Sequence, residues 1–204
     1  MDTNQETATH SFVTRAGAKL DAALSHFDIR PLNYTCLDLG SAEGGFCDCL
    51  LKRGAGCVYA VDVAYGIFDW KLRHDERVVL LERTNARYLD SDKIPETFDL
   101  ISCDVSFISL KKILPVAAKF LKASGHFLCL YKPQFELPRK HTGRHGIPLS
   151  QELIDDGIAG MTAFLATENI FVRAVYPSPI TGKKGNREYF LYGDTADDSI
   201  PLMR

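Results

Sequence analysis

The sequence predicts an α/β fold in which helices cover both faces of an open, mostly parallel sheet. Apolar runs of strand length recur five times between residues 34 and 131, and polar turns and helix-like segments separate them. A glycine-rich turn joins the first of these strands to the helix that follows it. Two further strands with a loop between them come after a long amphipathic segment. Five βα units followed by a β-loop-β end are typical of such a sheet.

The elements follow one another without an internal repeat or a low-complexity segment. The apolar spacing predicts helices over residues 14–27, 46–53, 67–74, 110–122 and 150–167. The predicted strands cover residues 34–39, 56–63, 78–82, 98–103, 126–131, 170–176 and 187–192. We expect residues 137–148, which combine prolines and glycines with basic side chains, to form a positively charged loop.

Length and composition favour one globular domain, since 204 residues can bury a large core and 46% of them are hydrophobic. The net charge of −2 does not by itself indicate a nucleic-acid-binding protein, although a basic face could be local. The six cysteines lie mostly in apolar runs, which favours reduced core thiols, and their spacing fits no zinc site. We expect no metal. Without a signal peptide or a membrane-spanning run, we expect a cytoplasmic protein.

The turn over residues 38–46 suggests a nucleotide-like cofactor. Gly40, Gly44 and Gly45 let a ligand approach the backbone, and the following helix directs free N–H groups at the turn. The pattern differs from the dinucleotide fingerprint, because Ala42 replaces its middle glycine and Glu43 would place a carboxylate beside a pyrophosphate. These two residues disfavour a nicotinamide-dependent oxidoreductase. A cofactor with a cationic end, such as S-adenosylmethionine, fits better than a dinucleotide, and a turn without any ligand is the alternative.

Charged residues gather where the predicted parallel strands end. Asp38, Asp62, Asp104 and Lys132 each lie at the carboxyl end of a strand, which is where open α/β sheets bind ligands. Asp62 lies about twenty residues after the glycine turn, at the distance expected for an acid that binds ribose hydroxyls. Asn85 follows the third strand and could contact an adenine edge, although an ordinary turn is equally consistent with these residues.

Several short motifs, in this order along the chain, resemble one family. They include Thr14-Arg15-Ala16-Gly17-Ala18-Lys19-Leu20, the turn over residues 38–46, Ala60-Val61-Asp62-Val63-Ala64-Tyr65-Gly66, Glu82-Arg83-Thr84-Asn85-Ala86-Arg87, Asp104-Val105-Ser106-Phe107-Ile108-Ser109-Leu110, Lys132-Pro133-Gln134-Phe135-Glu136, Ser178-Pro179-Ile180-Thr181-Gly182 and Gly185-Asn186-Arg187-Glu188. Together they resemble the TlyA hemolysin/ribosomal RNA methyltransferase family, a branch of the FtsJ-like RNA 2'-O-ribose methyltransferases. The resemblance spans about residues 12–192.

This resemblance implies a class I S-adenosylmethionine-dependent methyltransferase fold, Rossmann-like, with seven strands of which the last is antiparallel. It carries the family's catalytic Lys-Asp-Lys-Glu tetrad over to Lys19, Asp104, Lys132 and Glu188. The cofactor pocket that it implies consists of Asp38, Gly40, Ser41, Gly44, Gly45, Phe46, Asp62, Val63, Asn85, Ala86 and Asp104. The implied substrate is ribosomal RNA or a ribosomal subunit.

Two features depart from the family pattern. Family members usually begin with an S4-type RNA-binding domain, whereas only about ten polar residues precede the first motif here, so we expect RNA affinity to need a separate domain or protein. Ala16 and Ala18 also stand where the family tends to have glycine and a larger apolar residue. We expect residues 1–11 to be disordered, residues 12–193 to form the methyltransferase domain, and residues 194–204 to form a flexible tail.

The hypothesis for the chemistry is transfer of a methyl group to a ribose hydroxyl. Lys132 would act on that hydroxyl as a base or by stabilising the alkoxide, Asp104 would orient Lys132, and Glu188 would position Lys19. Two rim salt bridges of little energetic value are the alternative.

RNA phosphates would meet a basic rim around the cleft. Its members are Arg15, Lys183, Lys184, Arg187 and the loop over residues 137–148. As a whole, the chain could instead be an S-adenosylmethionine-binding interaction module. Direct membrane lysis, which the hemolysin name suggests, is disfavoured because no strongly basic amphipathic helix is present.

Overall fold

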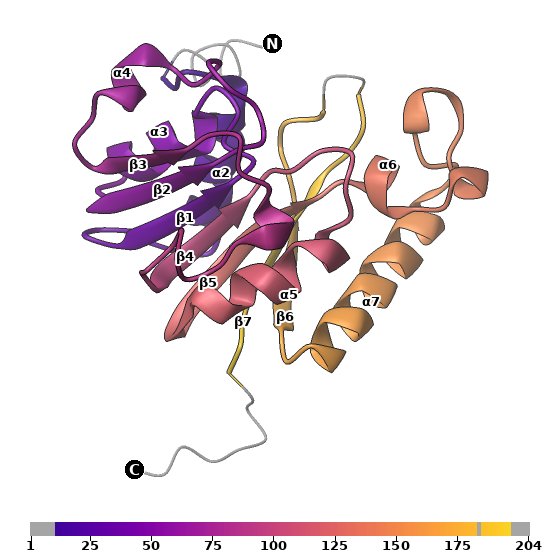
Figure 1. Ribbon diagram of the computed structural model, residues 1–204. Coiled ribbons are helices and arrows are strands. Elements are labelled where there is room, and N and C mark those ends of the chain that lie inside the picture. The colour runs from indigo at the N-terminus through magenta and orange to yellow at the C-terminus, as the bar shows by residue number, and fades with distance from the viewer. Residues whose placement is uncertain (1–10, 183–184, 197–204) are drawn as a thin grey trace.

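The protein is a three-layer α/β domain built on one seven-stranded sheet (Figure 1). The computed structural model describes residues 11–182 and 185–196. The strands lie in the order β3-β2-β1-β4-β5-β7-β6. Their bounds are β1 Thr35–Leu39, β2 Cys57–Val61, β3 Val78–Leu81, β4 Phe98–Cys103, β5 Leu121–Tyr131, β6 Phe171–Pro177 and β7 Tyr189–Asp194.

The first five strands are parallel, and β7 is inserted antiparallel between β5 and β6. The sequence prediction of a mostly parallel seven-stranded sheet with an antiparallel last strand is therefore confirmed. Strand order reverses between β1 and β4, whose carboxyl ends meet where Leu39 pairs with Cys103. In open α/β sheets this reversal point opens a crevice for ligands.

Helices cover both faces of the sheet because alternate residues of each buried strand point to opposite sides. Helices α2 (Arg15–His26) and α3 (Gly45–Lys52) lie on one face, and α5 (Leu114–Ala117) and α7 (Gln151–Thr167) lie on the other (Figure 1). Within β1, Cys36 packs in the cluster of α2 and α3, whereas Leu37 and Leu39 pack in the cluster of α5 and α7. The continuous apolar runs of the sequence thus supply two cores.

Two predicted helices are shorter than the sequence indicated. In place of one helix over residues 110–122, η2 (Leu110–Lys112), α5 and η3 (Ala118–Phe120) follow one another, and β5 already begins at Leu121. Pro115 restarts the helix at its first turn, and Leu121 pairs with Phe98 of β4. The helix predicted over residues 67–74 is reduced to α4 (Trp70–Arg73), because the Asp69 side chain caps its N-terminus.

The remaining short elements are η1 (Ala86–Tyr88), α6 (Pro133–Glu136), η4 (Arg139–His141) and η5 (Arg144–Gly146). No helix in the described ranges is both long and apolar enough to cross a membrane. The domain boundary predicted after residue 193 falls within β7, whose last residue is Asp194. Residues 1–10 of the segment predicted to be disordered and most of the predicted tail lie outside the described residues.

Candidate active site

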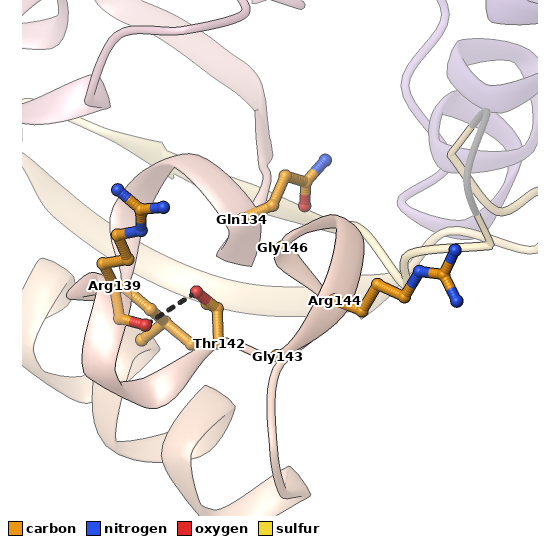
Figure 2. A pocket seen from close by; sticks show the side chains of 7 residues that line it. Gln134, Arg139, Thr142, Gly143, Arg144 and Gly146 are labelled. Carbon is orange, nitrogen blue, oxygen red and sulfur yellow. Dashed lines mark hydrogen bonds between the residues drawn. The ribbon is translucent and has the colours of Figure 1, made fainter.

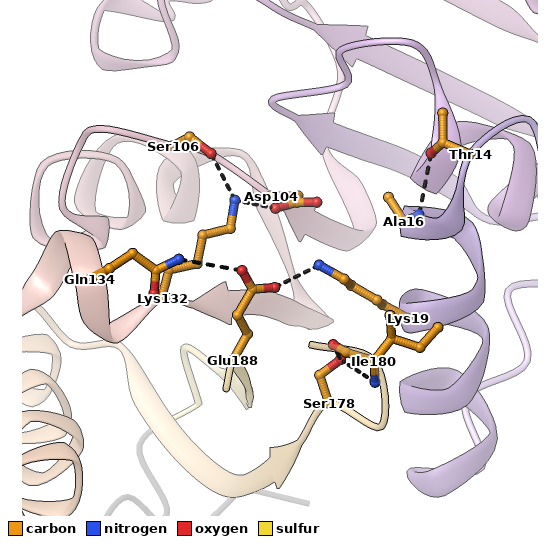
Figure 3. A network of polar contacts seen from close by, with 10 residues as sticks. All are labelled: Thr14, Ala16, Lys19, Asp104, Ser106, Lys132, Gln134, Ser178, Ile180 and Glu188. Carbon is orange, nitrogen blue, oxygen red and sulfur yellow. Dashed lines mark hydrogen bonds and ion pairs between the residues drawn. The ribbon is translucent and has the colours of Figure 1, made fainter. Parts of the chain in front are cut away.

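A cavity of about 650 Å³ opens at the carboxyl ends of β1, β4 and β5. The turn after β1, the segments after β4 and β5, the start of α2 and the segment before β7 all contribute to its wall. The four residues of the predicted tetrad all line it. Figure 3 shows how they converge, with Glu188 between Lys19 on one side and Lys132 and Gln134 on the other.

Lys19 and Glu188 form a buried ion pair with a distance of 2.6 Å between Nζ and Oε2. Their side chains are only 7% and 4% exposed. Lys19 lies on α2. The start of α2 packs so closely on α3 that the Thr14 side chain leaves no room for a Cβ at Gly45. The other carboxylate oxygen of Glu188 accepts a hydrogen bond of 3.4 Å from the Gln134 side-chain amide. Both charges are therefore compensated away from water.

Lys132 and Asp104 form the second ion pair, also 2.6 Å long, between Nζ and Oδ1. The Lys132 nitrogen also donates to the hydroxyl oxygen of Ser106 at 2.9 Å. Asp104 follows β4 directly, and Lys132 follows β5 directly, so adjacent parallel strands bring the two side chains together. The pair lies at the wall of the cavity, where a reacting hydroxyl could reach the nitrogen.

The glycine turn forms the opposite part of the cavity wall. Gly40 has a φ of +80°, and a Cβ there would come within 2.8 Å of the Asp104 carbonyl oxygen, so only glycine fits between the ends of β1 and β4. Gly44, with a φ of +96°, precedes α3 without any side-chain cap. The Ser41 hydroxyl lines the cavity and is buried without a hydrogen-bond partner among the described residues. Such a turn offers donors to a ligand.

Asp62 holds the glycine turn from the end of β2. Its carboxylate accepts backbone hydrogen bonds from Ala42 at 2.8 Å and from Ala64 at 2.7 Å. Ala42 has a positive φ of 46°, which costs energy for a residue with a Cβ. The bond from Asp62 therefore supports a strained residue of the turn, beside any part in ligand binding.

Asp38 is not part of the cavity wall. It is fully buried, and its Oδ1 accepts a hydrogen bond of 2.8 Å from Ser102. The pKa of Asp38 is raised to about 7, mainly by burial and also by the nearby charge of Asp104, against the lowering effect of the Ser102 hydrogen bond. A carboxyl with this pKa is partly protonated at neutral pH.

The predicted cofactor residues divide into two sets. Those that line the cavity are Gly40, Ser41, Gly45, Phe46 and Asp104. Those outside its wall are Asp38, Gly44, Asp62, Val63, Asn85 and Ala86. The Asn85 side chain caps η1 by accepting from the backbone of Arg87, and Val63 is exposed. The cofactor role of both sets stays a prediction.

Among the predicted RNA-binding residues, Arg15 lines the cavity and Arg187 is exposed on the segment before β7. Lys183 and Lys184 lie outside the described residues. Arg15 also stands at the start of α2, four residues before Lys19. Of the described members of the predicted rim, Arg15 and Gly146 of the 137–148 loop thus line the same cavity as the tetrad, whereas Arg187 does not.

Sequence reasoning missed several residues of the cavity wall. Ser106 contacts Lys132, Gln134 contacts Glu188, and Asn186 is buried with its side-chain oxygen unpartnered among the described residues. Phe107 is 90% exposed at a positive φ of 64°, and its ring lies 4.8 Å from that of Phe135. These residues all fall within the short motifs, and that placement was the only signal that could have indicated them.

The family model for the FtsJ-like methyltransferase matches residues 12–195. The chain belongs to the FtsJ-like methyltransferase family. It is 42% identical over 182 residues to "Putative rRNA methyltransferase YqxC" of Bacillus subtilis, covering 89% of this chain and 65% of that protein. It is 40% identical over 191 residues to "16S/23S rRNA (cytidine-2'-O)-methyltransferase TlyA" of Mycobacterium tuberculosis, covering 92% and 70%. The chain thus spans about two thirds of the length of these relatives.

Solved structures support the same assignment. The FtsJ-like chain matches "Putative hemolysin from Streptococcus thermophilus" with a TM-score of 0.87 and 38% identity, over 91% of this chain and 68% of that chain. A methyltransferase from Burkholderia thailandensis, solved with S-adenosylhomocysteine, matches with a TM-score of 0.63 and 19% identity, over 89% and 79%. The second likeness concerns the fold alone. The predicted class I methyltransferase fold and the family resemblance are confirmed.

Proposed function

We propose that this FtsJ-like chain transfers a methyl group from S-adenosylmethionine to a ribose 2'-hydroxyl of ribosomal RNA. The observation that carries the proposal is the meeting of two lysine–carboxylate pairs in a cavity whose other wall is the glycine turn. Ribose methylation needs a cofactor site and a group that handles the hydroxyl proton, within reach of each other. This cavity offers both.

The residues around the turn fit S-adenosylmethionine. Glu43 lines the cavity and suits a ligand that carries positive charge, and the Ser41 hydroxyl, which has no partner among the described residues, can donate to a carboxylate. Phe46 and Ile67 supply apolar wall for the adenosine part. When bound there, the cofactor supplies a methyl group already activated by its sulfonium. Asp62 would hold the ribose, and Asn85 would lie near the adenine.

Lys132 would act on the acceptor hydroxyl. Its nitrogen already contacts Asp104 and Ser106, so these contacts fix its position and leave its remaining face for the substrate. A neutral Lys132 can accept the hydroxyl proton, whereas a charged Lys132 stabilises the oxygen as negative charge develops on it. The Lys19–Glu188 pair would fix the ribose from the other side.

The substrate is proposed from the relatives and from the cavity rim. The Mycobacterium tuberculosis relative is named as a 16S/23S rRNA (cytidine-2'-O)-methyltransferase, which supports cytidine in ribosomal RNA as the acceptor. Arg15 at the cavity and the exposed Arg187 would bind phosphates beside it. A substrate of this kind, as free RNA or a ribosomal subunit, would place the protein in the cytoplasm.

Mapping of 2'-O-methylation tests the proposal. The purified chain is incubated with labelled S-adenosylmethionine and either naked ribosomal RNA or intact subunits. Lys132→Ala should lower the methylation rate by about 10³-fold or more, with cofactor affinity nearly unchanged. Lys122→Ala is the matched control, since Lys122 also pairs with an aspartate, Asp99 at 2.8 Å, but at the start of β5.

Retained turnover in Lys132→Ala would contradict the role of Lys132. Cofactor binding by the wild-type chain without transfer to either RNA or subunits would favour an interaction module instead. A thermal shift with NAD and none with S-adenosylmethionine would reject the cofactor assignment.

A further inference from the structure

A second hollow of about 620 Å³ lies next to the catalytic cavity, and we call it the side pocket (Figure 2). It is lined by Gln134, Leu137, Arg139, Thr142, Gly143, Arg144 and Gly146. Gln134 and Gly146 line the catalytic cavity as well, so the two spaces share a wall. A polymer whose acceptor nucleotide lies in one space can therefore place a neighbouring nucleotide in the other.

The loop that forms the side pocket is held in place by its own backbone. Thr142 and Pro148 form an antiparallel bridge, and the Gly143 N–H donates to the Ile147 carbonyl at 2.8 Å. Gly146 has a φ of +76°, and a Cβ there would lie 3.1 Å from the Gln134 Cβ. The loop therefore approaches α6 closely at a glycine, which keeps the side pocket adjacent to the tetrad.

Arg139 and Arg144 line the side pocket, and their guanidinium groups have no partner among the described residues. Figure 2 shows the Arg139 side chain on one side and that of Arg144 on the other. Neither guanidinium has an ion pair or a hydrogen bond to any described residue. Elsewhere in the described chain, arginines such as Arg53, Arg73 and Arg77 pair with carboxylates. Unpaired arginines on the two sides of a hollow favour anionic groups on its two sides.

We propose that the side pocket binds the RNA nucleotide adjoining the acceptor, with Arg139 and Arg144 on the phosphates that flank it. The inference rests on the proposed function. The volume of the side pocket lies within the range of pockets that bind small ligands, about 300–1,000 Å³. None of the described residues that line the pocket is aromatic and able to stack on a base, and phosphate contacts position an RNA without reading its sequence. We therefore expect this subsite to accept any base.

RNA binding by arginine variants tests the side pocket. A labelled single-stranded RNA of mixed sequence is titrated with the wild-type chain and with Arg139→Ala/Arg144→Ala. The double variant should bind about tenfold or more weakly, and the slope of log affinity against log salt should fall by roughly 1–2. Lys119→Ala removes the same charge from exposed η3, outside the predicted rim and both cavity linings, and it should change affinity by less than about twofold.

Replacing single phosphates of the RNA with uncharged linkages tests which phosphate contacts Arg139 or Arg144. An RNA spanning the methylated nucleotide is made with a methylphosphonate at one neighbouring linkage at a time. In the wild-type chain at least one such linkage should raise KM about tenfold, and in the double variant it should add nothing. Equal effects on both proteins would overturn the side pocket, as would wild-type RNA affinity in the double variant. Absence of methyl transfer by the wild-type chain contradicts the proposed function instead and leaves the binding comparison standing.

Discussion

The two lysine–carboxylate pairs of the cavity have the same length but different surroundings. Lys19–Glu188 and Lys132–Asp104 are both 2.6 Å long. The first is a closed pair, because both side chains are less than a tenth exposed. Glu188 also accepts a hydrogen bond from the Gln134 side-chain amide. The second is an open pair, in which Asp104 is 17% exposed and Lys132 contacts the hydroxyl of exposed Ser106.

This difference in burial favours separate roles for Lys19 and Lys132. A closed pair is costly to disturb, because either charge left alone would be buried without compensation. In the open pair, Lys132 is also only 9% exposed and the Asp104 Oδ1 is buried, but the Asp104 side chain as a whole is 17% exposed, so exchanging part of its contacts for a substrate should cost less than in the closed pair. The closed pair thus suits a fixed support, and the open pair suits the group that meets the reacting hydroxyl.

Removing one lysine from each pair should affect stability very differently. Lys19→Met keeps the aliphatic stem but leaves Glu188 buried and charged, which should lower the free energy of unfolding by about 3–5 kcal/mol. Lys132→Met leaves Asp104 near water and should cost only about 1–2 kcal/mol. Urea denaturation with an unchanged m-value measures both losses.

A double variant checks the origin of the larger loss. Lys19→Met/Glu188→Leu removes both charges, so it should regain most of the stability that Lys19→Met loses. Equal losses for the two single variants would show that the pairs do not differ in the way their burial indicates.

Ser106→Ala sharpens the description of the open pair. The change removes one of the two contacts that hold the Lys132 nitrogen, so kcat should fall about tenfold. KM for RNA and cofactor affinity should change little, because a positioning residue acts on the step rather than on binding. Ser106→Thr keeps a hydroxyl and should restore most of kcat. Full activity of the alanine variant, or a threonine variant as slow as alanine, would contradict this role.

The sequence predicted the convergence of the tetrad but not its detail. Asp104 and Lys132 each follow a parallel strand, and adjacent parallel strands end at the same edge, so strand prediction alone places them together. The roles of Lys19 and Glu188 came only from the family resemblance, since they lie 169 residues apart and no local pattern joins them. Ser106 was missed because a hydroxyl in a loop carries no periodicity that would indicate a partner.

Other differences have equally local causes. Residues 110–122 have helical apolar spacing, yet Pro115 and the pairing of Leu121 with Phe98 divide them between short helices and β5. Asp38 was predicted in the cofactor pocket from its position in the motif; its side chain is fully buried, contacts Ser102 and does not line the cavity, and its cofactor role stays a prediction. A motif gives the order of residues along a turn, but the packing of the neighbouring strand decides which side each one faces.

Asp38→Asn tests whether a third carboxyl belongs to the surroundings of the open pair. Burial, with the charge of Asp104 in second place among the raising effects, holds the pKa of Asp38 at about 7. Between about pH 4 and pH 7 the folded chain keeps a proton that the unfolded chain releases, so wild-type stability should fall as pH rises through this range. The amide that replaces the carboxyl in the variant does not titrate. Relative to the variant, the wild type should lose about 1–3 kcal/mol between pH 5 and pH 8 in urea denaturation, and parallel curves would show that Asp38 is ionised throughout.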